Sequence, residues 1–217
     1  MRPLLQARGH TLWIISYTGI GDRSHLANPG IDLETHIKDV VAALESEDLK
    51  EVVLIGHSYG GMVATGVADR VANRISQLVY LDAYVPQNGQ SMIDFSVPER
   101  VKQWRESAAT EGGGWAIPPG PMPSDTAPED VAWASPRRMM HPLKSFEQPI
   151  RLSGAAHAIP RTYIYCTRPR PIDVFRQFLE QSRREPGWRS FEIDASHNPH
   201  ITTPDVLAEL LDEVVRE

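Results

Sequence analysis

The sequence has very little cysteine, since Cys166 is the only one in 217 residues. A single cysteine excludes an intramolecular disulfide framework and a metal site built on paired cysteines, so a buried structural thiol is the expected role. No apolar run approaches the roughly 18 to 20 residues that span a bilayer. Residues 1–16 are interrupted by Arg8 and His10, where a secretory signal needs an unbroken apolar core. We therefore expect a cytoplasmic protein.

The sequence also lacks an excess of positive charge. Its 22 basic and 28 acidic residues give a formal net charge of −6, and they are scattered rather than gathered in blocks. This balance gives no electrostatic basis for binding nucleic acid or an anionic membrane surface. The sequence has no HExxH pair and no clustered Cys/His spacing for a metal, and residues 19–24 lack the lysine and the full glycine pattern of a nucleotide-binding loop. We predict no cofactor and no metal, and a small neutral or cationic ligand.

Alternating strand and helix patterns indicate an α/β fold in a single domain. At 217 residues, of which 41% are hydrophobic, the chain is long enough for one sizeable core. Short apolar, β-rich runs predict strands at residues 11–17, 51–56, 76–83, 161–166 and 189–193, the second of them fully buried. Helical spacing predicts helices that begin at Asp32, at Gly60, near 172 and at Pro204. The expected architecture is a mostly parallel sheet with helices on both faces.

Residues 86–150 break this alternation. Proline and glycine are dense there, and the tryptophans Trp104, Trp115 and Trp133 are spread among polar residues. The aromatic content favours a packed cap inserted into the domain over a disordered linker. These tryptophans would serve either a ligand pocket or the cap's own small core.

Ser58 lies at the centre of a Gly-x-Ser-x-Gly pattern between a predicted strand and a predicted helix. Gly56 and Gly60 flank it, where side chains would collide as strand and helix meet at a tight angle. Ser58 can then adopt a strained backbone conformation, with its hydroxyl projecting from the sheet and the N–H of Tyr59 pointing toward the same space. The pattern predicts Ser58 as a nucleophile and the Tyr59 N–H as an oxyanion donor, and a tight turn without chemistry is the alternative.

A serine hydroxyl needs a base to take its proton, and the base needs a carboxylate to orient it. Among the eight histidines, His197 lies on the loop between the last strand and the last helix. Such a loop can fold back over the carboxyl edge of the sheet, so we predict His197 as the base, with His200 as a weaker candidate. His57 is expected to point away from Ser58. The others are expected to be surface or structural residues: His10, His25, His36, His141 and His157.

Five stretches together resemble the bacterial α/β-hydrolase family of small carboxylesterases, which is related to the plant methyl esterases and hydroxynitrile lyases. They are GHSYGGMV, LVYLDAYVPQNGQS, PEDVAWASPRRMMHPLKSF, RTYIYCT and SHNPHITTPDVLAELL, and the similarity runs over nearly all of the chain. The resemblance implies Ser58 as nucleophile, His197 as base and a cap over an apolar ester pocket. Asn198 follows His197 where the lyases have a lysine, which disfavours cleavage of cyanohydrins.

The acid of the site has several candidates. In the plant relatives an aspartate follows the strand equivalent to residues 161–166, but Pro169 stands at about that place here. Asp82 ends the strand that follows the serine turn, and that strand is adjacent to the serine strand in the sheet. We predict Asp82 as the acid, and its alternative role is a cap of the following loop. Asp173 is the next candidate, followed by Asp194 and Asp94.

Members of the family begin with a strand whose His-Gly loop supplies a second oxyanion donor, and this chain starts downstream of that strand. Losing one donor costs about 100- to 1,000-fold in rate, and a sheet without one strand has an uncovered edge. We therefore expect either a weak enzyme or a homodimer that completes the sheet. The predicted activity is hydrolysis of a small carboxylic ester through an acyl-enzyme, and a ligand-binding pseudoenzyme is the alternative.

Overall fold

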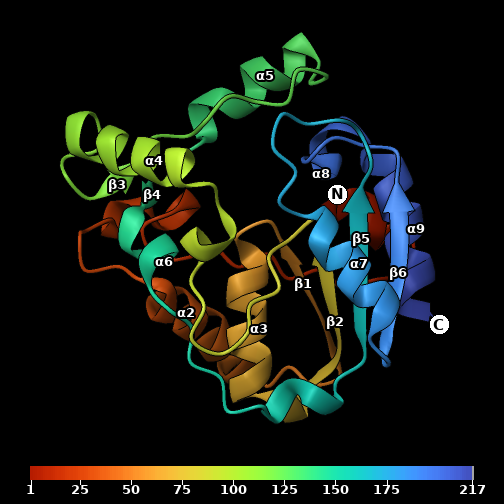
Figure 1. The fold of residues 1–217 in the computed structure, drawn as a ribbon. Coiled ribbons are helices and arrows are strands. Elements are labelled where there is room, and N and C mark those ends of the chain that lie inside the picture. The colour runs from red at the N-terminus through yellow and green to blue at the C-terminus, as the bar shows by residue number, and fades with distance from the viewer. Residues whose placement is uncertain (217) are drawn as a thin grey trace.

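The computed structural model describes residues 1–216, which fold around a four-stranded parallel sheet with strand order β1-β2-β5-β6 (Figure 1). The strands of this sheet are β1 (Val52–His57), β2 (Ile75–Leu81), β5 (Arg161–Cys166) and β6 (Trp188–Ile193). The longer helices are α2 (Leu33–Ser46), α3 (Gly60–Arg70), α4 (Pro98–Thr110), α7 (Arg176–Arg184) and α9 (Pro204–Arg216). The predicted α/β fold with a parallel sheet is confirmed.

Short elements connect or extend these. The short α-helices are α1 (Arg2–Gln6), α5 (Pro128–Ala134), α6 (Leu143–Glu147) and α8 (Pro199–Thr202). The 3₁₀ turns are η1 (Gly21–Leu26), η2 (Ala72–Arg74), η3 (Met92–Phe95), η4 (Ser135–Arg137) and η5 (Ala155–Ala158). The strands β3 (Ala116–Ile117) and β4 (His141–Pro142) form a separate antiparallel pair. Within residues 1–216, no helix combines the length and apolar character needed to cross a bilayer.

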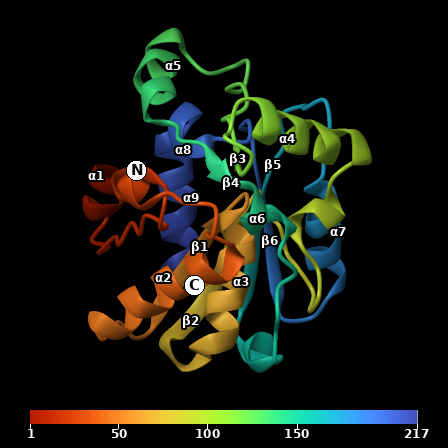
Figure 2. The ribbon, with the colours of Figure 1, turned by 90° about the vertical axis from the view of Figure 1, so that its left-hand side faces the viewer.

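The sheet separates two apolar clusters because neighbouring side chains along a strand point to opposite faces. On β2, Leu78 and Tyr80 pack with the buried residues of α2, α3 and α7. Val79 and Leu81 point to the other face and pack with α1 and α9. Figure 2 shows this layering, with α1 and α9 on one side of the sheet and α7 on the other. Burial on both faces explains why β2 is apolar along nearly its whole length.

Helix α2 begins where the sequence predicts. The Asp32 carboxylate accepts a hydrogen bond from the Thr35 N–H at 2.9 Å, and the Thr35 side chain in turn accepts from the Asp32 N–H. Gln148, just after α6, accepts from the Glu34 N–H at 2.8 Å. This hydrogen bond connects the cap to the first turn of α2.

Three sequence predictions differ from the structure at the level of elements. Residues 11–17 form no strand, and Trp13 and Ile14 are 51% and 62% exposed. β1 is a strand but is only partly buried, because it lies at the edge of the sheet and pairs with β2 alone in the described chain. Helix α7 begins at Arg176, so Ile172 precedes it rather than sharing its apolar face.

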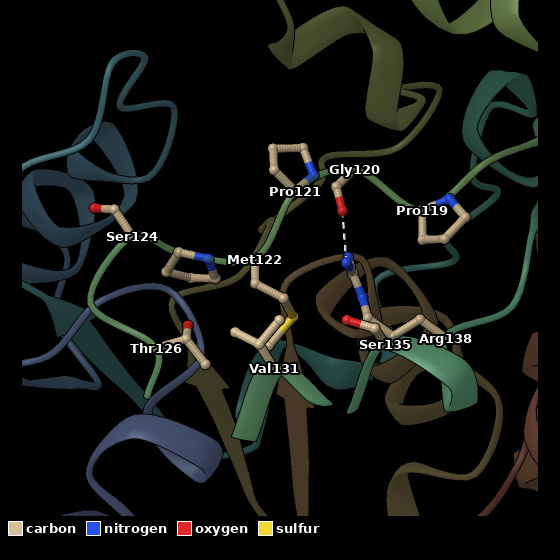
Figure 3. Close-up of a pocket in the computed structure, with 10 residues that line it drawn as sticks. Pro119, Gly120, Pro121, Met122, Ser124, Thr126, Val131, Ser135 and Arg138 are labelled. Carbon is tan, nitrogen blue, oxygen red and sulfur yellow. Dashed lines mark hydrogen bonds between the residues drawn. The ribbon is translucent and has the colours of Figure 1, made fainter. Parts of the chain in front are cut away.

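The predicted insertion, residues 86–150, holds η3, α4, β3, α5, η4, β4 and α6, and most of it lies beyond the carboxyl ends of the strands (Figure 1). Trp104 packs against Phe146 inside this segment, with ring centroids 5.3 Å apart. Trp133 is 58% exposed and lies under the guanidinium of Arg137. A cavity of about 490 Å³ separates residues 119–126 from α5 and η4 (Figure 3). Trp104 therefore belongs to the cap's own core, and Trp133 lies on its outer surface.

Candidate active site

The turn between β1 and α3 has the strained geometry that its glycines predict. Ser58 has a φ of +55°, which is unusual for a residue with a side chain. A Cβ on Gly56 would lie 2.6 Å from the Gly60 carbonyl oxygen, and one on Gly61 would lie 2.1 Å from the Tyr84 carbonyl oxygen. A Cβ on Gly60 would meet nothing nearer than 3.5 Å. The close packing therefore requires Gly56 and Gly61, and the prediction that Gly60 is needed for steric reasons is wrong.

A second strained turn follows β2 and lies directly beside the first. Asp82 has a φ of +43°. The Ser58 N–H donates to the Leu81 carbonyl at 3.3 Å, and the Tyr84 N–H donates to the Ser58 carbonyl at 3.2 Å. The Asp82 N–H donates to the Ile164 carbonyl of β5 at 2.7 Å. These backbone bonds fix the two turns relative to each other and to the sheet.

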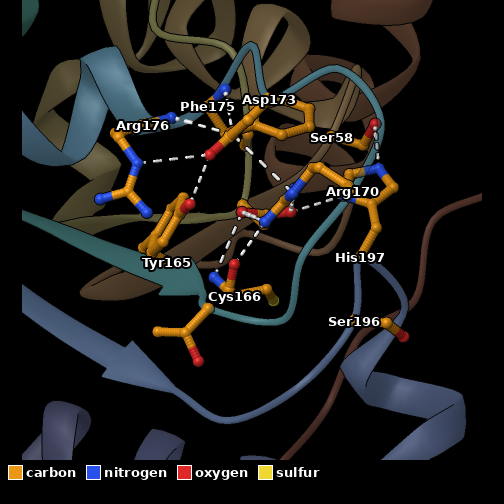
Figure 4. A network of polar contacts seen from close by, with 12 residues as sticks. Ser58, Tyr165, Cys166, Arg170, Asp173, Phe175, Arg176, Ser196 and His197 are labelled. Carbon is orange, nitrogen blue, oxygen red and sulfur yellow. Dashed lines mark hydrogen bonds and ion pairs between the residues drawn. The ribbon is translucent and has the colours of Figure 1, made fainter. Parts of the chain in front are cut away.

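The structure brings Ser58, His197 and Asp82 together. His197 Nε2 lies 3.0 Å from Ser58 Oγ, and His197 Nδ1 lies 2.7 Å from Asp82 Oδ2 (Figure 4). The three residues come from the ends of β1 and β2 and from the loop between β6 and α8. Asp82 is fully buried, whereas the His197 side chain keeps 31% of its surface exposed. This is the order of contacts, hydroxyl to imidazole to carboxylate, that activates a serine.

The other candidate carboxylates are engaged elsewhere. Asp173 accepts from the Tyr165 hydroxyl at 2.5 Å and from the Phe175 N–H at 3.1 Å, before the first turn of α7. Asp94 accepts from the Ser91 N–H at 2.7 Å and so caps η3. The Asp194 side chain is 84% exposed and pairs with Arg168.

Aromatic and histidine rings surround the imidazole of His197. Phe175 stacks on it with ring centroids 4.9 Å apart. His57 points away from Ser58, as predicted, and its Nε2 donates to the His197 carbonyl at 2.6 Å. The His200 ring lies 4.9 Å from the His57 ring. Burial, followed by the charge of His197, lowers the pKa of His57 far below its usual value and that of His200 to about 4, so both rings are neutral near pH 7.

Tyr59 links the serine turn to the rest of the domain. Its hydroxyl lies 2.8 Å from Nδ1 of His36, whose Nε2 donates to the Thr18 carbonyl at 3.2 Å. Burial lowers the pKa of His36 to about 4. The Tyr59 ring also lies 4.7 Å from that of His141 in the cap. Tyr59 precedes the first residue of α3, where backbone N–H groups have no partner inside the helix.

Sequence reasoning missed Arg170. This residue follows β5, and its guanidinium contacts both carboxylate oxygens of Asp82 (Figure 4). The signal that could have indicated it is its position, because side chains that follow the carboxyl ends of neighbouring parallel strands gather at one edge of the sheet.

No metal site accompanies these residues. Across residues 1–216, no group of three or more histidine, cysteine, aspartate or glutamate side chains is arranged to hold a metal ion. Cys166 is buried, and burial raises the pKa of its thiol.

Known proteins resemble this chain along nearly its whole length. Residues 1–210 match the model of the Alpha/beta hydrolase family. The carbendazim hydrolyzing esterase of Nocardioides sp. (strain SG-4G) is 36% identical over 95% of this chain and 89% of its own. Pyrethroid hydrolase of Sphingobium wenxiniae (strain DSM 21828 / CGMCC 1.7748 / JZ-1) is 26% identical over 96% of this chain and 79% of its own.

A solved structure also resembles this chain along nearly its whole length. An extracellular alpha/beta-hydrolase from a Paenibacillus species, described as sharing structural and functional homology with Tobacco Salicylic Acid Binding Protein 2, superimposes with a TM-score of 0.85. It is 26% identical, and the match covers 99% of this chain and 91% of that one. The resemblance predicted from the sequence is confirmed: the chain belongs to the alpha/beta hydrolase family and has esterases among its relatives.

Proposed function

We propose that this protein hydrolyses carboxylic esters, with Ser58 as nucleophile, His197 as general base and Asp82 as the acid that orients the imidazole. The observation that carries the proposal is the continuous chain of contacts at 3.0 Å and 2.7 Å from the Ser58 hydroxyl to the Asp82 carboxylate. The esterase names of the relatives support the same reaction class.

The first half of the reaction forms the acyl-enzyme. His197 Nε2 removes the proton of the Ser58 hydroxyl as Oγ attacks the ester carbonyl, and the imidazolium is stabilised by Asp82. The N–H of Tyr59 donates to the oxygen that becomes negative in the tetrahedral intermediate. His197 then returns the proton to the departing alcohol.

The second half repeats these roles with water. His197 takes a proton from a water molecule that attacks the acyl carbonyl, and Ser58 is released when the proton is returned to it. The net change is one ester and one water to one acid and one alcohol.

Rings near the serine support an apolar or aromatic substituent on the ester. Phe175 stacks on His197, and Tyr59 lies 5.3 Å from Phe146 of the cap. Relatives named as methylesterases or as hydrolases of carbendazim and pyrethroids are consistent with a small leaving alcohol or an apolar ester.

The direct test is the hydrolysis of a short-chain p-nitrophenyl ester by this chain, with Ser58→Ala as the matched control. Release of nitrophenol that disappears in the variant would support the esterase. A folded protein with no release above that of the variant would favour a ligand-binding pseudoenzyme, and cleavage of a cyanohydrin without ester hydrolysis would favour a lyase.

The cytoplasmic location stays a prediction, which fractionation of the source cells would test.

A further inference from the structure

The carboxylate of Asp82 is held by a cation as well as by His197. Arg170 Nη1 lies 2.5 Å from Asp82 Oδ2, and Nη2 lies 3.2 Å from Oδ1 (Figure 4). Nη2 also donates to the Cys166 carbonyl, which folds residues 166–170 back on themselves. The Arg170 side chain is only 14% exposed and Asp82 is fully buried. A two-pronged contact of this kind fixes the plane of a carboxylate as well as its charge.

Arg170 and His197 share one oxygen of the Asp82 carboxylate. Oδ2 accepts from Arg170 Nη1 and from His197 Nδ1, while Oδ1 accepts from Arg170 Nη2 and from the Cys166 N–H at 3.2 Å. Arg170, His197 and the Cys166 N–H therefore hold the carboxylate through both of its oxygens. The charge that would stabilise an imidazolium is partly neutralised by the guanidinium on its other side.

We propose that Arg170 is a positioning residue, which fixes the orientation of the Asp82 carboxylate and, through it, the orientation of the His197 imidazole. The inference rests on the proposed function, in which His197 is the general base. An imidazole held in one orientation keeps its Nε2 directed at the Ser58 hydroxyl, 3.0 Å away.

Other charged or titratable groups surround this pair. Asp173 lies 3.8 Å from Arg170 Nε and offsets part of its charge. Burial opposes the charge of Arg170, but the hydrogen bonds and charge of Asp82 outweigh it and raise the pKa of Arg170. The remaining titratable groups near Asp82, Arg170 or His197 are His57, His200, Tyr84, Tyr163, Tyr165 and Cys166. None of these six is a cation near pH 7, so Arg170 supplies the positive charge at this carboxylate.

Removing the guanidinium leaves a buried carboxylate without its cation, and a buried charge without a partner is strongly disfavoured. We therefore expect the acid limb of the pH–activity profile to move to higher pH in such a variant. Looser positioning of the imidazole also lowers the plateau of the profile.

The test compares kcat/KM for p-nitrophenyl ester hydrolysis between pH 4 and pH 9 in the wild type, Arg170→Gln, Arg170→Lys and Arg176→Gln. Arg176 is the matched control, because it pairs with Asp173 at 3.6 Å and faces the Tyr165 ring. For Arg170→Gln we expect an acid limb about one pH unit higher and a plateau about 10- to 100-fold lower. Arg170→Lys keeps the charge, so its acid limb should stay near the wild-type position while its plateau falls.

A second readout does not depend on turnover. The proton of His197 Nδ1, which is hydrogen-bonded to Asp82, should give a downfield proton NMR signal in the wild type and in Arg176→Gln, and that signal should broaden or move in Arg170→Gln. An Arg170→Gln variant with the wild-type acid limb and an unchanged signal would overturn the proposal. If the wild type has no Ser58-dependent turnover, the proposed function fails and the NMR comparison alone decides the role of Arg170.

Discussion

Asp82 and Asp173 lie in the same polar network, but only Asp82 contacts the imidazole of His197. We expect Asp82→Asn to lower kcat by about four orders of magnitude, since an amide favours the wrong tautomer of the imidazole. Asp173→Asn removes contacts to Tyr165 and to the start of α7, so its turnover should stay within about tenfold of the wild type. Steady-state kinetics on both variants measures the difference, and a larger loss in Asp173→Asn would refute the assignment of Asp82.

The three glycines of the serine turn differ in the space around them. Gly61→Ala would place a methyl group 2.1 Å from the Tyr84 carbonyl oxygen, whereas Gly60→Ala has open space out to 3.5 Å. We expect Gly61→Ala to lower the free energy of unfolding by about 2 kcal/mol or more and Gly60→Ala to change it little. Urea unfolding of the two variants checks this, and equal losses would show that the packing around Gly61 can relax.

Residue patterns predicted part of the site. Ser58 and Asp82 each follow a strand, and His197 lies on the loop after the last strand, so their types and positions pointed to the arrangement found in the structure. Arg170 was missed because residues 167–171 follow no periodic pattern. The stacking of Phe175 on His197 was missed because a helix was predicted to begin near 172, whereas α7 begins at Arg176. Arg170 reaches Asp82 across 88 residues of sequence, and only the folded loop shows that contact.

At the scale of elements, apolar runs predicted the strands of the sheet well, but they also predicted a strand at residues 11–17 that the structure does not have. The apolar sequence of that segment is typical of a strand, but a strand also needs a neighbour for its backbone hydrogen bonds. Ile15 and Tyr17 pack on the core without pairing with β1. Composition alone does not reveal whether such a neighbour is available.

Helix α2 carries a buried histidine that should make stability depend on pH. Burial lowers the pKa of His36 to about 4, while in the unfolded chain it titrates near 6.5. The unfolded state therefore binds more protons below pH 6.5, and the stability is lost as the pH falls from about 6.5 toward 4. Between pH 7 and pH 5 this single group should remove about 2 kcal/mol from the free energy of unfolding.

The measurement is urea unfolding at pH 7 and pH 5, for the wild type and for His36→Gln. We expect the variant to be less stable at pH 7, because the contacts of His36 to Tyr59 and Thr18 change. Its loss of stability between the two pH values should be smaller by about 2 kcal/mol. Equal pH dependence in both proteins would show that His36 does not contribute.

At the scale of the whole molecule, β1 leaves one edge of the sheet open within residues 1–216. An open edge offers unpaired backbone groups to a second chain, and the exposed Trp13 and Ile14 add apolar surface. We expect the protein either to form a homodimer or to have weak turnover as a monomer. Size-exclusion chromatography with light scattering, combined with the activity of each fraction, tests this, and a fully active monomer would contradict it.

The central claim is that Ser58 is an activated nucleophile, and covalent labelling by a serine-directed phosphonate tests it most directly. We expect intact-mass and peptide analysis to find one label, on Ser58, that is absent from Ser58→Ala and strongly slowed in His197→Ala. A folded wild-type protein in which Ser58 takes no label would contradict the claim that Ser58 is an activated nucleophile.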